Sequence, residues 1–271
     1  MPKLPRLPTP PVPGPLQEPP PRPGELNGNG AGPLEAGKQA GITVVDWVDE
    51  RTSLSGAARW LMFRKVPKGT NWFYTLGSAT MFAFLSQAVT GVFLAMYYRP
   101  DPAGGAYESI RYVTNDVFLG QFVRGMHKWG SSVMVVLIFL HMGRVFFFGA
   151  YKYPRELNWV IGVVLLILTM TMSFTGYLLP FDQRAYWATV VGVNINGTGP
   201  LVGPYLSDFL RGGSEFGATT LSRFYAIHML LVPGLLMALI GAHLYLVAKL
   251  GTTAPPWQKA QERPELREAE V

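Results

Sequence analysis

The 271-residue sequence contains no cysteine. Disulfide bonds, thiolate metal ligands and a heme attached through a cysteine thioether are therefore all excluded. For the same reason, cysteine usage says nothing about the redox compartment in which the protein works. Any bound cofactor must be held by other side chains.

Charged residues are also scarce, and their scarcity is uneven. Asp, Glu, Lys and Arg make up 15% of the chain, against about a quarter in a typical soluble domain, and the mean hydropathy is +0.19. Residues 69–98, 157–181 and 224–248 contain no charged residue, and 129–151 contains only Arg144. Each window exceeds the roughly 20 residues that cross a hydrocarbon core of about 30 Å. Because unpaired backbone groups are costly in lipid, we expect four membrane-spanning helices.

The expected fold is an all-α integral membrane protein, an up-and-down bundle of four transmembrane helices. The windows place these helices at about 71–98, 119–149, 158–179 and 224–249. The link between the third and fourth helices, 180–223, is the longest and is rich in glycine and aromatic residues. Long loops often carry functional sites.

Outside the bundle domain, expected at 43–251, both ends of the chain are polar. Twelve of the 23 prolines lie between Pro2 and Pro33, and a tract this poor in apolar side chains cannot bury enough surface to order itself. We therefore predict a disordered tail at 1–42 and a polar tail at 252–271. Residues 43–64 mix aromatic and charged side chains, which is typical of a helix lying on the membrane surface.

The formal net charge of +6 and the pI near 9.5 do not indicate nucleic-acid binding. Lys and Arg gather beside the hydrophobic windows, where such residues set topology and meet lipid headgroups. Short basic segments lie before the first helix, between the second and third, and after the fourth. By the positive-inside rule that side is cytoplasmic, which places both termini in the cytoplasm.

All four histidines lie in two of the four predicted membrane helices. His127 and His141 are fourteen positions apart on the second helix, and His228 and His243 are fifteen positions apart on the fourth. These intervals correspond to about 21 and 22 Å along a helix axis and to roughly whole numbers of turns, so each pair shares one face. The second and fourth helices run in the same direction. The first histidines of the two helices therefore share one level, and the second histidines share another.

Paired imidazoles at two levels indicate two electron-carrying hemes. An iron that only passes electrons is well held by two neutral axial nitrogens with no open position. We therefore predict two noncovalent, bis-histidine b hemes stacked across the membrane, one on His127 and His228 and the other on His141 and His243.

Glycines recur at the shorter of these intervals on the other two helices. Gly77 and Gly91 are fourteen positions apart, and so are Gly162 and Gly176. Since glycine weakens a helix, matched pairs indicate close approach of a flat group such as a porphyrin to the backbone. Packing of helices through small residues is the alternative interpretation.

Two arginines lie beside the predicted ligands. Arg124 comes three positions before His127, and Arg144 three positions after His141. Each is one helical turn from its histidine, where its charge would pair with a heme propionate. The alternative is that both side chains reach to the membrane interface.

Several motifs together resemble cytochrome b of the bc and b6f complexes, in the split form typified by cytochrome b6. The similarity runs from about Val44 to Gly251 and includes the longer histidine interval on the fourth helix. The motifs that carry it are NWFYTLG at 71–77, QAVTG at 87–91, YYRP at 97–100, RGMH at 124–127, HMGR at 141–144, PREL at 154–157, TGYLLP at 175–180 and TLSRFYAIH at 220–228.

The resemblance implies a role for each histidine. It assigns His127 and His228 to the heme nearer the outer side, and His141 and His243 to the heme nearer the cytoplasm. It further implies that quinol is oxidised at the outer side and quinone reduced at the inner side, with proton translocation.

The resemblance also bears on the quinone sites. Tyr186 and Trp187, in the link between the third and fourth helices, are candidates for shaping the quinol-oxidising site. No residue of this chain is identified as catalytic beyond these two candidates. The run at 188–192 is similar to menaquinol-oxidising members, which slightly favours menaquinone.

Three departures from the family pattern change what is expected. Thr75 stands where b6-type proteins carry the cysteine of an extra covalent heme, so we expect no heme c on this chain. The Pro-Glu-Trp-Tyr motif of the quinol site is missing, and in split forms it belongs to a separate three-helix subunit. A family arginine is replaced near Ala248, beside Lys249, which leaves the contacts to an inner quinone open.

The expected function is that of a diheme subunit in a quinol:cytochrome c or plastocyanin oxidoreductase, incomplete on its own. The resemblance implies partners: the three-helix cytochrome b subunit, a Rieske iron–sulfur protein and a c-type cytochrome, in a dimeric complex. Two alternatives remain from the residues alone. One is a heme b membrane anchor of a different quinone-linked dehydrogenase, and the other is a transporter or channel with ion-relaying histidines.

Overall fold

The computed structural model describes residues 44, 46–53, 56 and 67–257. All regular structure in these residues is helical, which confirms the predicted fold class. The chain divides into two compact units, Met1–Arg64 and Lys65–Val271. The predicted disordered tail at 1–42 and residues 258–271 of the predicted polar tail lie outside the described residues.

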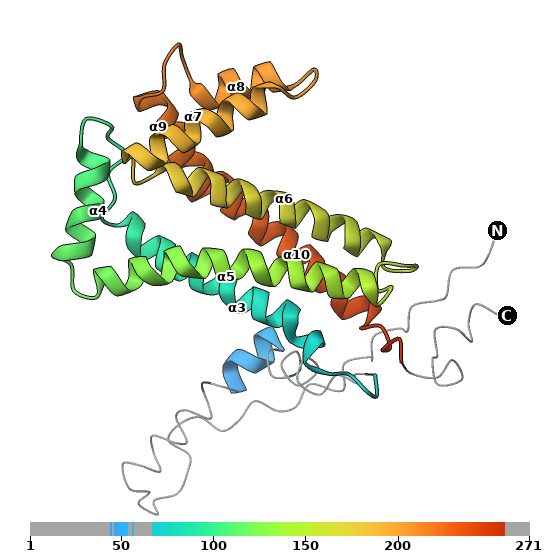
Figure 1. Cartoon of the computed structure of the whole chain (residues 1–271). Coiled ribbons are helices and arrows are strands. Elements are labelled where there is room, and N and C mark those ends of the chain that lie inside the picture. The colour runs from blue at the N-terminus through green and yellow to red at the C-terminus, as the bar shows by residue number, and fades with distance from the viewer. Residues whose placement is uncertain (1–43, 45, 54–55, 57–66, 258–271) are drawn as a thin grey trace, which may run out of the picture. The chain divides into compact units, whose positions relative to one another are not determined.

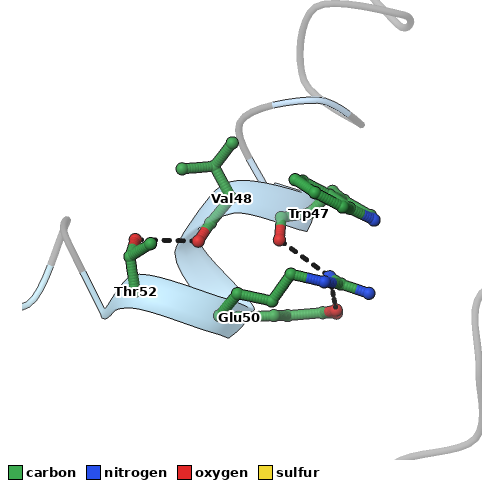
Figure 2. Close-up of polar contacts among 5 residues, drawn as sticks. Trp47, Val48, Glu50 and Thr52 are labelled. Atoms are coloured by element: carbon green, nitrogen blue, oxygen red, sulfur yellow. Dashed lines mark hydrogen bonds and ion pairs between the residues drawn. The ribbon is translucent and has the colours of Figure 1, made fainter.

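In the first unit, residues 46–52 are helical and fall within the segment predicted to lie on the membrane surface. Arg51 Nη1 donates to the carbonyl of Trp47 at 2.8 Å, and the guanidinium lies 4.1 Å from the centroid of the Trp47 ring. At the next position, Thr52 Oγ1 donates to the carbonyl of Val48, one turn earlier in the helix, at 2.8 Å (Figure 2). The interfacial role of this helix stays a prediction.

The second unit contains four spans long and apolar enough to cross a membrane, as predicted. Helix α3 (Leu76–Ala95) follows a 3₁₀ turn at Trp72–Thr75, and α5 (Gly120–Phe147) and α6 (Glu156–Leu178) are the second and third spans. The fourth span begins at Ala218 rather than near 224. It consists of α9 (Ala218–Ala226), a π turn η2 (Ile227–Leu231) and α10 (Val232–Leu250).

The four spans pack in two pairs. Helix α3 lies against α5, and α6 lies against α10 (Figure 1). A buried cluster of Ala83, Met134 and Ile138 joins α3 to α5 midway along their length. Many outward side chains are large and apolar, among them Phe82 and Leu230 at 76% and 77% exposure. Such a surface suits contact with lipid acyl chains.

The links predicted as loops contain three further helices. These are α4 (Gly105–Asn115), α7 (Gln183–Gly197) and α8 (Gly203–Arg211). They gather with α9 at one end of the bundle (Figure 1), which we call the loop end. A shared core explains this grouping, since it draws on α4, α6, α7, α8 and α9. Its buried members are Ala106, Leu178, Val193, Leu210, Leu221 and Phe224.

The opposite end of the bundle, formed by residues 148–155 and 251–257, is called the tail end here. Tyr74 Oη donates to the carbonyl of Thr253 at 3.1 Å, and Trp257 Nε1 donates to the carbonyl of Gly69 at 3.2 Å. The polar tail predicted from residue 252 therefore begins with a segment that packs against the start of the first span.

Candidate cofactor site

The structure brings the four histidines together in the two pairs that their spacing predicts. The ring centroids of His127 and His228 are 6.4 Å apart, and the ring planes cross at 78°. The centroids of His141 and His243 are also 6.4 Å apart, again with a 78° crossing. The first pair lies toward the loop end and the second toward the tail end.

This geometry suits one metal ion held between each pair of rings. Two imidazole nitrogens, each about 2 Å from a single metal, put the centroids of coaxial rings roughly 6–6.5 Å apart. In the described part of the chain, no three His, Asp or Glu side chains gather closely enough to hold a metal alone. A metal at either level would thus have two imidazole ligands from these side chains, and a heme is a cofactor that supplies the rest.

His228 has its proton fixed on one ring nitrogen. Its Nδ1 lies 3.0 Å from the carbonyl oxygen of Met172, which can only accept a hydrogen bond. Nδ1 must therefore carry the hydrogen, and the Nε2 lone pair is left free to bind a metal. The hydroxyl of Thr175 lies 3.3 Å from the same Nδ1.

His127 has a comparable partner on the first span. Its Nδ1 is 2.9 Å from Thr90 Oγ1, and this hydroxyl itself donates to the carbonyl of Ser86 at 2.7 Å. With its own hydrogen engaged, the Thr90 oxygen accepts from Nδ1–H. Nε2 of His127 is therefore also the unprotonated nitrogen.

Sequence reasoning did not identify Thr90 or Thr175 as site residues. Each threonine directly precedes a glycine of the matched pairs, at 90–91 and 175–176. The repeated Thr-Gly dipeptide on the first and third spans was the signal that could have found them.

Each of the four predicted glycines faces one of the four histidines. A Cβ atom built on the glycine would meet the Cε1 atom of the opposite ring, and the separation differs widely among the four positions. It is 2.5 Å for Gly176 and His228, 3.1 Å for Gly77 and His141, 3.3 Å for Gly91 and His127, and 3.8 Å for Gly162 and His243. The first and third spans thus make room for the imidazole rings of the second and fourth.

A cavity of about 430 Å³ surrounds the tail-end pair. His141 and His243 line it together with Gly77, Gly162 and Arg144. Its volume falls in the range of about 300–1,000 Å³ common for small-molecule and cofactor sites.

Arg144 places an uncompensated cation in this cavity. Its guanidinium stacks 3.8 Å from the centroid of the Tyr74 ring, yet its buried Nε and Nη2 find no hydrogen-bond partner among the described residues. Buried N–H groups of a cation without hydrogen-bond partners are costly, and an anion can satisfy them. A ligand that carries carboxylates, as heme does, fits this requirement. Arg124, the counterpart at the loop end, is half-buried one turn from His127.

The two quinol-site candidates lie at the loop end, in the first turn of α7. Tyr186 packs edge-on against Phe181 and Phe216, at centroid distances of 5.9 and 6.3 Å. Trp187 is 59% exposed, and its Nε1 donates to Gln183 Oε1 at 2.9 Å. An aromatic cluster with one outward-facing indole therefore stands at this end of the bundle.

Tyr98 adds a buried phenol to the loop end. Its hydroxyl donates to the carbonyl of Leu179 at 2.6 Å, and its ring stacks on Tyr225 with centroids 5.4 Å apart. Burial, and to a smaller extent the neighbouring Tyr225, raises the pKa of Tyr98. The phenol stays neutral and acts as a fixed donor that joins the first span to the end of the third.

Thr75, which replaces a cysteine of the b6-type pattern, is exposed at the tail end and donates from Oγ1 to the carbonyl of Trp72 at 2.7 Å. The absence of a covalent heme stays a prediction.

Comparison with known proteins agrees with this geometry. A family model described as "Cytochrome b/b6/petB" matches residues 61–251. The menaquinol:cytochrome c reductase cytochrome b subunit of Geobacillus thermodenitrificans is 44% identical over 218 residues, covering 78% of this chain and 97% of the relative. Cytochrome b6 of Heliobacterium modesticaldum is 42% identical over 213 residues, covering 78% of this chain and 100% of the relative.

A solved structure titled "Hyperthermophilic respiratory Complex III" contains a similar chain, with a TM-score of 0.72 and 29% identity. The match covers 83% of this chain and 62% of that chain. The family model spans well over half of the sequence, and the curated relatives are matched over nearly their whole length. This integral membrane protein therefore belongs to the cytochrome b/b6 family.

Proposed function

We propose that the protein is the diheme cytochrome b subunit of a quinol:cytochrome c or plastocyanin oxidoreductase. In this role it carries electrons from a quinol-oxidation site at the loop end to a quinone-reduction site at the tail end, coupled to proton translocation. The observation that carries the proposal is the pair of histidine couples, each with centroids 6.4 Å apart and planes crossing at 78°. The names of the curated relatives, which include a menaquinol:cytochrome c reductase subunit, support it.

Each histidine pair would hold the iron of one noncovalent b heme. When bound, each heme supplies a one-electron iron couple within a low-dielectric layer. The protein's own part is to present neutral imidazoles in fixed tautomers. At the loop end, the carbonyl of Met172 and the hydroxyl of Thr90 keep the hydrogens on Nδ1 and the Nε2 lone pairs free.

The remaining site residues have supporting roles. Arg144, and Arg124 at the other level, would neutralise propionates, and the four glycines would let a heme and its histidine rings pack closely against the first and third spans. Tyr186 and Trp187 would border the quinol site at the loop end. Menaquinone is slightly favoured as the substrate, both by the run at 188–192 and by the names of two curated relatives.

The chain would work only within a larger assembly. Its proposed partners are a separate three-helix cytochrome b subunit, a Rieske iron–sulfur protein and a c-type cytochrome, in a dimeric complex. The basic residues at the tail end, such as Lys152, Arg155 and Lys249, support an orientation in a bacterial membrane with this end and both termini in the cytoplasm.

The test is spectroscopic. A reduced-minus-oxidised spectrum of the purified complex is expected to resolve two bis-imidazole b hemes for each copy of this chain. His127→Ala is expected to abolish the loop-end heme and stop quinol turnover, while the four spans remain inserted. Lys128→Ala, at the exposed neighbouring position, is the matched control and should keep both hemes. A colourless wild-type complex, or two intact heme signals in the His127→Ala variant, would sink the proposal.

A further inference from the structure

The two ligand-bearing spans space their histidines differently. The interval is fourteen positions on α5, from His127 to His141, and fifteen on the fourth span, from His228 to His243. In an uninterrupted α-helix, one extra residue adds about 100° of rotation and about 1.5 Å of rise. Both intervals come within about 60° of a whole number of turns, so each pair still shares one broad face. On two regular α-helices, however, the second histidines would be offset by about 100° relative to each other, and the two pairs could not have the same geometry.

The structure nevertheless gives the two pairs the same geometry. The centroid distance and crossing angle agree at both levels. The reason lies in the fourth span, where His228 itself belongs to the π turn η2 (Ile227–Leu231). Here Val232 N–H donates to the carbonyl of Ile227, five positions back instead of four. A π turn takes up one additional residue in a helical turn.

The third span gives an independent measure of the required register. Helix α6 runs unbroken through Gly162 and Gly176, which have the shorter interval of fourteen positions. These glycines face His243 and His228, which have the longer interval of fifteen. The longer interval can match the shorter one on a regular helix only if the extra residue is absorbed between the two histidines.

Local sequence favours the π turn at this place. Pro233 lies just beyond it and has no N–H to donate to the carbonyl of Met229, and its ring would clash with that carbonyl in a regular helix. An uninterrupted α-helix is therefore disfavoured immediately after His228.

We propose that the π turn Ile227–Leu231 is a register element that absorbs the extra residue of the fourth span and so aligns His228 and His243 with His127 and His141. This inference rests on the proposed function, because the alignment serves to build two bis-imidazole sites. The turn residues and Pro233 are positioning residues that act through His228 and His243.

The test is a variant of the fourth span that lacks both the extra residue and the π turn that takes it up. Leu230 lies in the turn and is 77% exposed, so its deletion removes little packing. Deleting Leu230 in combination with Pro233→Ala leaves the shorter interval, which can run as an unbroken α-helix. In the complex purified from membranes, this variant is expected to keep two hemes per chain. Both midpoint potentials and the EPR signals of the near-perpendicular ligand pairs should be unchanged.

The matched control is deletion of Val133, a 52% exposed residue between His127 and His141 on α5. This span has no π turn to take up the change, so one histidine should rotate by about 100°, and the heme content should fall from two to one. Loss of a heme in the Leu230 variant, or two hemes in both variants, would overturn the proposal. Gly234→Ala, which would meet nothing within 4 Å, controls for any change near Pro233.

Two further outcomes keep the test decisive. If neither deletion variant inserts, a cryo-EM map of the wild-type complex decides. A π turn between the two ligands supports the proposal, and an unbroken α-helix from 218 to 250 contradicts it. If the wild-type complex itself lacks two b hemes, the proposed function has failed. That result is distinct from a failure of the register element, in which only the deletion variants depart from expectation.

Discussion

The two histidine pairs share one ring geometry but differ in what surrounds them. At the loop end, both Nδ1 atoms are hydrogen-bonded, His228 to the Met172 carbonyl and His127 to the Thr90 hydroxyl. At the tail end, Nδ1 of His243 makes no well-aligned hydrogen bond among the described residues, although the backbone of Asn158 interacts with this imidazole. The tail-end pair instead lines a cavity of about 430 Å³ that is also lined by Arg144, whose Nε and Nη2 have no hydrogen-bond partner among the described residues.

The two ends therefore differ in what orients the imidazole rings. The loop-end imidazoles are held by the protein before any cofactor binds, because their hydrogen bonds fix both tautomer and ring orientation. The tail-end imidazoles gain their environment from what fills the cavity, which should include an anion for Arg144. The loop-end site should therefore react most sharply to a steric change at Gly176, and the tail-end site to a change of charge at Arg144.

The largest expected effect comes from adding one methyl group at the loop end. In Gly176→Ala the new Cβ would lie 2.5 Å from Cε1 of His228, whose ring cannot retreat without breaking its bond to Met172. Overpacking of this kind forces shifts that typically cost about 1–3 kcal/mol. We expect loss of the loop-end heme, measured as heme content per chain and as disappearance of one component in a redox titration.

Gly162→Ala is the matched control on the same helix. Its Cβ would lie 3.8 Å from Cε1 of His243, an ordinary van der Waals distance, and alanine is a better helix former than glycine. Because this contact is milder, the tail-end heme should be lost to a smaller extent in Gly162→Ala than the loop-end heme is in Gly176→Ala. Equal loss of heme in the Gly176→Ala and Gly162→Ala variants would show that the two histidine pairs are packed equally tightly, and it would contradict the steric difference between the two ends.

The next largest effect should come from charge at the tail end. Arg144→Gln removes the buried cation beside the tail-end pair, so the oxidised, more positive iron is favoured relative to the reduced form. The midpoint potential of the tail-end heme should fall by about 60–120 mV. This corresponds to a ten- to hundredfold change in the redox equilibrium constant, at about 59 mV per tenfold change for one electron. Redox titration followed by visible spectroscopy measures this shift.

The loop-end potential should stay within error in the Arg144→Gln variant. Arg111→Gln is the control, because Arg111 is exposed on α4 and pairs with Glu108 at 3.3 Å, where its charge is screened by solvent. An equal shift of both hemes, or a rise in the tail-end potential, would contradict the assignment of Arg144.

Much of the site could be predicted from the sequence, because its main elements are periodic. Windows with no charged residue, or with one, predicted the four spans, and the similar histidine intervals on two of them predicted which histidines meet. The matched glycines were predicted to permit close approach of a porphyrin; in the structure they lie against the histidine rings, and their packing against a heme stays a prediction. Periodicity works here because an α-helix converts a sequence interval directly into a distance and a face.

Features that break periodicity were not predicted. The π turn at Ile227–Leu231 changes the relation between interval and rotation, and nothing in the composition of the span marks it except Pro233. The earlier start of the fourth span at Ala218 depends on the buried packing of Leu221 and Phe224 with the loop-end helices. The partners of the histidine Nδ1 atoms include a backbone carbonyl, that of Met172, which no side-chain motif can reveal.

The smallest expected effect concerns the loop-end hydrogen bonds themselves. Thr90→Val keeps the shape of a buried side chain but removes the oxygen that accepts from Nδ1–H of His127. That hydrogen bond makes the imidazole a stronger donor and so favours oxidised iron. Its loss should raise the loop-end midpoint potential by roughly 20–40 mV, the equivalent of up to about 1 kcal/mol for one electron.

Thr175→Val makes the same change beside the other loop-end ligand and serves as the graded control. His228 keeps its bond to the Met172 carbonyl at 3.0 Å, whereas the lost contact to Thr175 is longer, at 3.3 Å. The potential should therefore rise by less than in the Thr90 variant, and the tail-end heme should not respond to either change. A larger shift in the Thr175 variant would mean that its hydroxyl, and not the Met172 carbonyl, orients His228.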